Sequence, residues 1–151
     1  MALRQPVNEE HFLSVVVPTC NEADNVIALA ERIHGALTGI AHEIVFVDDS
    51  SDETVDVLTT LSQTDPVVRF VHRSGERGLG TAVVLGFSLA HGDVITVMDA
   101  DLQHPPELLP AMLTALEQEK ADVVIASRFI PGGADGGLDP WRKLVSWVAR
   151  S

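Results

Sequence analysis

The sequence predicts an α/β protein in which a mainly parallel β-sheet lies between two layers of helices. Short apolar runs rich in β-branched residues alternate with segments of helical period, and turn or capping residues stand at the junctions. Strands that alternate with helices imply right-handed crossovers and therefore parallel pairing. The run at residues 94–98 is apolar on both faces, which is typical of a sheet covered on both sides. We therefore expect a three-layer α/β/α fold.

The individual elements follow from the same patterns. The expected strands are residues 13–17, 43–47, 67–71, 94–98 and 122–126. The expected helices are residues 26–37, one marked by Val55, Leu58 and Leu61 that ends near residues 65–66, residues 81–90, and a fourth that begins at Pro105 and Pro106. Asn21 or Asp24 is expected to cap the first helix. Residues 129–140 form a glycine-rich loop, and residues 141–150 suit either a helix docked on the sheet or a helix at a membrane interface.

Length and composition narrow the class of protein. The chain has 151 residues, of which 46% are hydrophobic, so one ordered domain is expected. With 22 acidic residues against 10 basic ones, the net charge is -12, which argues against nucleic-acid partners and means that a bound phosphate needs a cation. Cys20 is the only cysteine, and no stretch reads as a signal peptide or a membrane span. We expect a cytoplasmic location, either free or at the cytoplasmic face of a membrane.

The residues with functional potential cluster where the expected strands end. In parallel sheets the ligand crevice lies outside the carboxyl ends of the strands. The unusual residues of this sequence all follow such ends: residues 18–22, 48–52, 73–80 and 99–103, and Arg128. Several strand ends that meet at one edge predict a binding site more strongly than any single motif.

Asp99 and Asp101 are the strongest candidates for metal ligands. They are two residues apart after an apolar strand, so if the extension continues their side chains lie on one side, about 6–7 Å apart along the chain. Mg²⁺ and Mn²⁺ take oxygen ligands, commonly one or two carboxylates with substrate phosphates. Such an ion would join the protein to a nucleoside diphosphate, with Gln103 and His104 as further ligands or orienting groups. The structural alternative is that both aspartates are turn and capping residues before Pro105.

Asp48 and Asp49 suit a nucleotide. They place like charges side by side, which folding alone rarely requires, and one of them could accept a hydrogen bond from a base N–H or a ribose hydroxyl. The alternative is that Asp49 and residues 50–52 only cap the next helix.

The loop at residues 73–80 carries glycines in the spacing G-x-x-G-x-G, the reverse of the dinucleotide-binding fingerprint. A nicotinamide cofactor is therefore not indicated. The loop can still present backbone N–H groups to an anion at the start of a helix, helped by Arg73 or Arg77.

Together these segments resemble the family 2 glycosyltransferases, especially dolichol-phosphate mannose synthases and bacterial polyprenyl-phosphate glycosyltransferases. The matching stretches are residues 17–22, 47–52, 78–82 with 86–87, 98–107 and 127–133. The resemblance implies the GT-A fold, a Rossmann-like nucleotide-diphospho-sugar transferase fold. It also implies a nucleoside-diphosphate-sugar donor, for which GDP-mannose is the first candidate and UDP-glucose the second, and a polyprenyl-phosphate acceptor. The implied cofactor is Mg²⁺ or Mn²⁺, and peripheral contact with a membrane is expected.

The resemblance also implies roles for individual residues. The nucleotide pocket would be lined by Pro18, Asn21, Glu22, Asp48, Asp49, Gly78, Gly80 and Asp99, and the metal would be held by Asp99, Asp101 and Gln103. Asp101, Arg128 and Arg142 would be the catalytic residues, with the two arginines facing the acceptor phosphate or the donor diphosphate. Relatives continue past the position of Ser151. We therefore expect a chain cut short on its acceptor side, with a nucleotide-sugar-binding core at residues 1–127 and the start of the acceptor region at residues 128–151.

The implied reaction needs no protein base. A polyprenyl phosphate has a second pKa of about 6, so it is largely dianionic at neutral pH and can attack the anomeric carbon directly, with inversion. Two alternatives remain: a non-catalytic nucleotide-sugar-binding remnant, and a haloacid-dehalogenase-type phosphatase with Asp99 as nucleophile and Asp101 as acid. The phosphatase motif normally sits on the first strand, whereas three expected strands precede it here.

Overall fold

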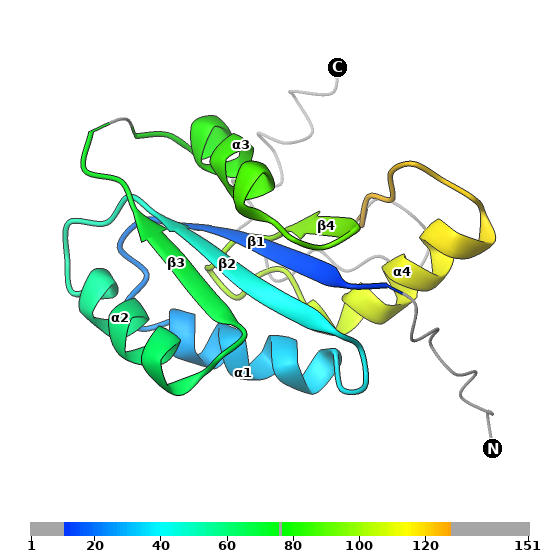
Figure 1. The fold of residues 1–151 in the computed structure, drawn as a ribbon, viewed down its shortest axis with the longest axis horizontal. Helices are drawn as coiled ribbons and strands as arrows, with labels where there is room; N and C mark the ends of the chain where they lie inside the picture. Colours follow the sequence, from blue (N-terminus) through cyan, green and yellow to red (C-terminus); the bar gives the residue numbers. More distant parts are fainter. Residues whose placement is uncertain (1–10, 76, 128–151) are drawn as a thin grey trace, which may run out of the picture.

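The computed structural model describes residues 11–75 and 77–127, which form a parallel four-stranded sheet. The strand order is β3-β2-β1-β4, and all three pairings are parallel. The strands are β1 (Leu13–Thr19), β2 (His42–Asp48), β3 (Val68–His72) and β4 (Val94–Val97). The carboxyl ends of β1, β2 and β3 lie side by side (Figure 1), and β4 ends beside Val16 of β1 and runs in the same direction, as the alternating sequence pattern predicts.

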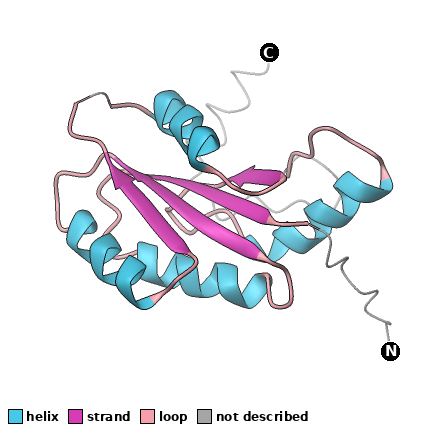
Figure 2. Ribbon diagram, viewed as in Figure 1, coloured by secondary structure: helices cyan, strands magenta, loops and turns pink. Residues whose placement is uncertain are grey.

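Helices cover both faces of the sheet, which confirms the predicted three layers. The helices are α1 (Val26–Ala36), α2 (Thr54–Thr64), α3 (Leu79–Leu89), a 3-10 turn η1 (Pro106–Leu108) and α4 (Leu109–Gln118). In Figures 1 and 2, α3 lies on one side of the strands and α1 and α2 lie on the other. None of the helices in the described ranges combines the length and the apolar composition that a membrane crossing requires.

The main core lies between the sheet and α1. Alternate residues of β1 and β2, such as Val15, Val17 and Phe46, point to this face and are completely buried. Leu29 and Ile33 meet them from α1, because residues four apart share one face of a helix. Burying each such side chain stabilises the fold by about 1.5–3 kcal/mol.

On the other face, α3 approaches the sheet closely at Gly86. A Cβ at this position would lie 2.3 Å from Cγ1 of Val16, so only glycine allows this packing distance. The close approach fixes α3 over β1 and β2 and brings its first residue, Leu79, to the edge where the strands end.

The expected strand at residues 122–126 is wrong. These residues form no strand, and Val123 and Ile125 are 72% and 81% exposed. A strand needs a hydrogen-bonded partner, and within the described residues β4 pairs only with β1. Ile95 and Val97 of β4 are also about two-fifths exposed, at 39% and 40%, so the predicted covering of both faces of β4 is wrong for one face. The expected loop and terminal helix after residue 127 lie outside the described residues.

The expected cap of α1 is also wrong. The helix starts after Asn25, which makes no side-chain capping bond, and neither Asn21 nor Asp24 is the capping residue. Asn21 has a positive φ of 60°, and its side chain bonds to the next loop instead. The side chain of Asn21, which the local pattern assigns to capping α1, therefore makes a tertiary contact instead.

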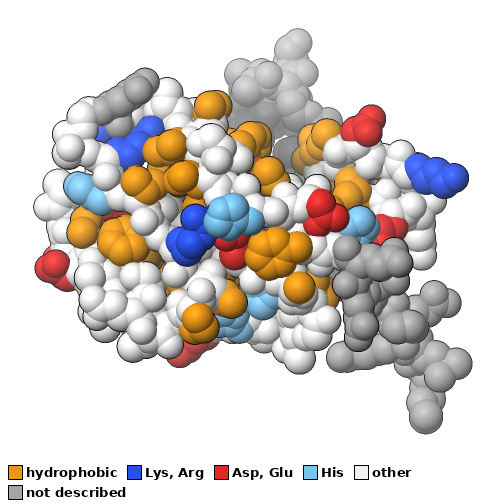
Figure 3. All heavy atoms as spheres, viewed as in Figure 1, with side chains coloured by type: hydrophobic (Ala, Val, Ile, Leu, Met, Phe, Trp, Pro, Cys, Tyr) orange, Lys and Arg blue, Asp and Glu red, His pale blue; other side chains and the backbone are white. Residues whose placement is uncertain are grey.

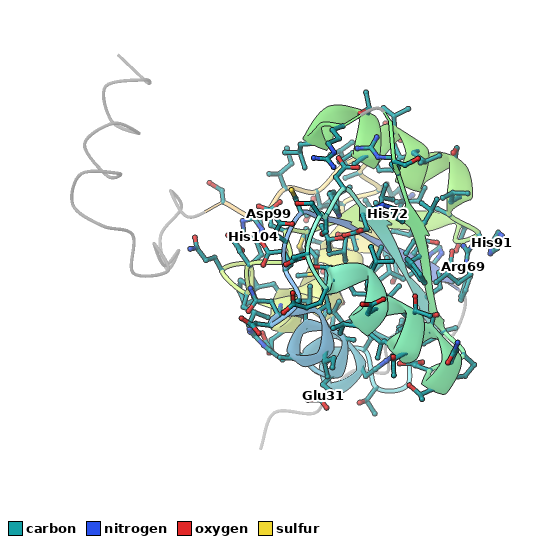
Figure 4. The ribbon with its side chains drawn as sticks, turned by 90° about the vertical axis from the view of Figure 1, so that its left-hand side faces the viewer. Glu31, Arg69, His72, His91, Asp99 and His104 are labelled. Carbon is teal, nitrogen blue, oxygen red and sulfur yellow. The ribbon has the colours of Figure 1, made fainter. Side chains whose placement is uncertain are left out.

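Glu43 is buried on the α3 face near the amino ends of the strands. Its carboxylate accepts hydrogen bonds from Ser14 Oγ at 2.6 Å, from the backbone N–H of His91 at 2.7 Å and from Arg69 Nη2 at 2.7 Å. Arg69 and His91 lie together in Figure 4, and Figure 3 shows basic, histidine and acidic side chains meeting near the centre of the face in view. Burial alone would raise the pKa of Glu43, but these hydrogen bonds outweigh it and hold the pKa below the ordinary value of 4.5.

Replacing Glu43 with Gln should lower the free energy of unfolding at neutral pH by about 1–3 kcal/mol, because charge-assisted bonds are lost. The folded-state pKa is the lower one, so this stabilisation is complete above pH 4.5 and disappears as the pH falls through the folded-state value. The free energy of unfolding, measured with urea over an acid pH series, should therefore change less with pH for Glu43→Gln than for the wild type. Glu31→Gln is the control, because Glu31 is exposed and points away from the sheet in Figure 4. Equal acid slopes for wild type and Glu43→Gln would contradict the prediction.

Candidate functional site

The candidate site lies at the carboxyl ends of the strands. Figure 4 views this edge, with Asp99 and His104 beside each other and His72 farther along, at the end of β3. Because all the strands are parallel, the segments after β1, β2, β3 and β4 meet at this one edge. The structure thus brings together the described segments that the sequence places after strands.

The loops after β1 and β2 are tied to each other. The backbone N–H of Asn21 donates to Ser50 Oγ at 2.7 Å, and the backbone N–H of Ser51 donates to Asn21 Oδ1 at 2.9 Å. The N–H of Glu22 donates to Thr54 Oγ1 at 3.0 Å. These bonds hold the loop after β1 against the loop after β2 and the start of α2, as expected of a pocket built on two strand ends, and Pro18 lies within β1 itself, opposite Val47.

Asp48 is completely buried and satisfied by protein groups. Its carboxylate accepts hydrogen bonds from Thr19 Oγ1 at 2.8 Å, from Ser50 Oγ at 2.5 Å and from His72 Nδ1 at 2.8 Å. A buried carboxylate needs such partners. Asp48 therefore braces β1, β2 and β3 where they end, and it offers no exposed surface to a ligand.

Asp49 forms the centre of a second network on the α3 side. Arg73 donates to it through Nε at 2.7 Å and Nη2 at 2.5 Å, and the backbone N–H of Gly78 donates to Oδ2 at 3.0 Å. Arg73 also donates to the carbonyl of Gly78 and to Thr81 Oγ1, which joins the loop to α3. The hydrogen bonds from Arg73, followed by that from Gly78, hold the pKa of Asp49 below its ordinary value against the effect of burial.

Sequence reasoning missed the partners of both aspartates. His72 pairs in register with Asp48, and Arg73 follows directly, so the parallel alignment of β2 and β3 was the signal that could have found them. Gly78 has a φ of 134°, which favours glycine, and its N–H is already used by Asp49. Gly80 is exposed in the first turn of α3.

The aspartates after β4 lie in a turn. The strand ends at Val97 and the chain bends from Ala100 onward, so the extension that the sequence analysis assumed between Asp99 and Asp101 is not kept. The side chain of Asp99 is 50% exposed and lies 3.4 Å from Nδ1 of His104. Asp101 is exposed, and its Oδ1 accepts the backbone N–H of Gln103 at 3.0 Å. This local bond agrees with the turn role that the sequence left open, and the carboxylates still face solvent.

The chemistry of these groups fits a hard divalent cation. Asp99, Asp101 and Gln103 offer side-chain oxygens, the ligand type that Mg²⁺ and Mn²⁺ prefer. Across residues 11–75 and 77–127, no three His, Cys, Asp or Glu side chains are grouped closely enough to hold a metal by themselves. The donor set therefore fits an ion that takes its remaining ligands from water and substrate phosphates. Arg128 and Arg142, the expected catalytic arginines, lie outside the described residues.

Comparison with known proteins agrees with this arrangement. Residues 14–145 match the family described as glycosyl transferase family 2. Dolichol-phosphate mannosyltransferase of Pyrococcus furiosus is 45% identical over 135 residues, which cover 89% of this chain and 38% of that protein. Undecaprenyl-phosphate mannosyltransferase of Micrococcus luteus is 39% identical over 137 residues, which cover 88% of this chain and 55% of that protein.

A solved structure supports the same relationship. The mannosyltransferase of Pyrobaculum calidifontis in complex with GDP-mannose and Mn²⁺ superposes with a TM-score of 0.64 and 25% identity, over 73% of this chain and 33% of that one. This match confirms the predicted GT-A fold. The chain spans 38% and 55% of the two curated relatives, so it corresponds to part of each. Since the family match covers most of the sequence, the chain belongs to glycosyl transferase family 2.

Proposed function

We propose that this chain is the donor-binding part of an inverting, metal-dependent glycosyltransferase that moves mannose from GDP-mannose to a polyprenyl phosphate. The observation that carries the proposal is the edge where the strands end. This edge holds the Asp49–Arg73 network and the exposed Asp99 and Asp101. The chain is also similar to proteins named dolichol-phosphate mannosyltransferase and undecaprenyl-phosphate mannosyltransferase. UDP-glucose is the second candidate donor.

The base of the donor would meet Asp49. Each carboxylate oxygen has two acceptor sites, and Asp49 Oδ2 uses both, for Arg73 and Gly78. Within the described part of the chain, Oδ1 accepts from Arg73 Nε, so one of its two acceptor sites would serve a base N–H. Pro18, Asn21 and Glu22 would form the adjoining wall, because Pro18 pairs with β2 at the end of β1 and the loop with Asn21 and Glu22 is tied to the segment after β2.

The diphosphate would lie toward the turn after β4. Asp99, Asp101 and Gln103 would hold the divalent ion there, and Gly80 would lie near the phosphates at the start of α3. When bound, the ion supplies positive charge that stabilises the diphosphate leaving group. The protein's own residues contribute ligand oxygens and a rigid frame.

The transfer step follows from the chemistry of the acceptor. An oxygen of the dianionic lipid phosphate forms a bond to the anomeric carbon while the bond from that carbon to the diphosphate breaks, which inverts the configuration. Arg128 and Arg142 would position the phosphate by charge-assisted hydrogen bonds. Residues 128–151 would then begin the acceptor side, next to a core at residues 1–127, at the cytoplasmic face of a membrane.

Calorimetric titration of the chain with GDP, UDP, GDP-mannose and UDP-glucose, with and without Mn²⁺, tests the proposal. We expect GDP and GDP-mannose to bind only with Mn²⁺ and more tightly than the uridine compounds. Absence of binding for all four ligands would overturn the proposal. Release of phosphate from p-nitrophenyl phosphate would support the phosphatase alternative, and donor binding without transfer to a lipid phosphate would support the non-catalytic one.

A further inference from the structure

Two histidines and an aspartate form a hydrogen-bonded chain at the end of the sheet opposite to the candidate site. His34 lies in the last turn of α1, His42 is the first residue of β2, and Asp65 directly follows α2. His34 Nε2 lies 2.6 Å from Asp65 Oδ2, and His34 Nδ1 lies 2.9 Å from His42 Nε2. His42 Nδ1 lies 2.8 Å from the carbonyl oxygen of Ile40. We call these three side chains the histidine clamp.

Counting hydrogens shows which charge state the clamp has. The carbonyl of Ile40 only accepts, so His42 Nδ1 carries a hydrogen, and the carboxylate of Asp65 requires one on His34 Nε2. The bond between the two rings forms only when one of the facing nitrogens, and not both or neither, carries a hydrogen. Two neutral imidazoles hold one hydrogen each, so the intact clamp holds one extra proton. Its positive charge is shared between His34 and His42 and balanced by Asp65.

We infer that the histidine clamp responds to pH. Its hydrogen bonds join the end of α1 to the start of β2 only while the clamp holds this one shared proton. Loss of the proton leaves two lone pairs facing each other between His34 and His42. Gain of a second proton leaves two N–H groups facing each other on two positive rings. Either change breaks the bond that joins the end of α1 to the start of β2. Stability at this end of the sheet should therefore peak at intermediate pH and fall on both sides.

Charged groups near the clamp lie on three elements. The carboxylate of Asp65 lies against His34, and the end of α1 places the negative pole of the helix dipole beside the same ring. Glu31, one turn earlier on α1, is exposed and points away from the sheet (Figure 4). Glu43, the next residue of β2, is bonded to Arg69 on the opposite face of the sheet. The side chains of His34 and Asp65 are 33% and 21% exposed, so protons can reach them.

Hydrogen exchange and histidine NMR on the whole chain test the inference between about pH 5 and pH 8, where histidines change charge. The reporters are the backbone amides of Ile40, which donates to Leu37, and of Val67, which donates to Asp65. We expect their protection to be highest at intermediate pH and to fall about five-fold on either side, the size of one net hydrogen bond. The ¹⁵N shifts of the two rings should show one shared hydrogen at the maximum.

Three variants separate this gating from a merely structural role. His42→Gln should give a flat profile, because an amide can either donate to His34 or accept from it. Asp65→Asn should move the high-pH loss to lower pH, because the counter-charge is gone. His91→Gln should keep the wild-type profile, because His91 lies outside the clamp. Independent titration of His34 and His42, with the same exchange profile in wild type and His42→Gln, would overturn the inference.

Discussion

Replacing Asp101 with Asn should abolish Mn²⁺-dependent binding of GDP and leave the fold intact; we expect a loss of about 100-fold in affinity, the upper end of what losing a group behind a metal ligand costs. The side chain is exposed, and the hydrogen bond that it accepts from the backbone N–H of Gln103 can be accepted equally well by the amide oxygen of Asn. The amide lacks the negative charge that a hard cation requires. Calorimetry measures the affinity, and thermal unfolding measures the fold.

The control for Asp101→Asn is Asp56→Asn, which removes an equally exposed charge from the start of α2. We expect it to bind GDP like the wild type. Asp99→Asn should behave like Asp101→Asn, because under the proposed function both carboxylates would hold the same ion. Removing Mn²⁺ with a chelator should lower wild-type affinity to the level of the two variants. Undiminished Mn²⁺-dependent binding in Asp101→Asn would remove this residue from the metal site.

The second large effect is expected at Arg73. Replacing Arg73 with Met should lower the free energy of unfolding by about 3 kcal/mol, because the carboxylate of Asp49 then loses its counter-charge. Both side chains are about nine-tenths buried, so water cannot take the place of the guanidinium. Nucleotide binding should weaken as well, since Arg73 holds both Asp49 and the loop at Gly78. Urea unfolding and calorimetry measure the two effects.

The pairing of Arg73 with Asp49 also predicts how the stability of the protein changes with pH. The folded-state pKa of Asp49 lies below the ordinary value of 3.8, so its stabilisation is full above pH 3.8 and is lost as the pH falls through the lower folded-state value. Arg73→Met should therefore flatten the acid part of the stability curve. The double variant Asp49→Asn/Arg73→Met should be more stable than Arg73→Met alone, because no buried charge is left unpaired. Equal stability of wild type and Arg73→Met would contradict a role for this pair in the fold.

Much of the fold could be predicted because the patterns that specify it are local. Alternating apolar runs and helical stripes placed all four observed strands and the four α-helices, since burial of one face imposes those periods. The expected strand at residues 122–126 failed for a different reason. Its residues have strand composition, but pairing depends on a neighbouring strand that composition does not supply.

The site was predicted in outline and not in detail. The positions of Asp99, Asp101 and Asp49 at one edge follow from parallel strand order. The partners Arg73 and His72 were not predicted, because they depend on the register between β2 and β3.

The sequence by itself therefore determined the layers, the parallel order and the edge at which charged residues gather, because periodicity and turn chemistry act between near neighbours. Only the tertiary structure decided the different roles of Asp48 and Asp49, which are adjacent and chemically identical. Asp48 is buried beneath Thr19 and His72, whereas Asp49 turns toward Arg73 and the backbone of Gly78. The difference arises because successive side chains of a strand point to opposite faces, and distant segments of the chain decide what each face meets.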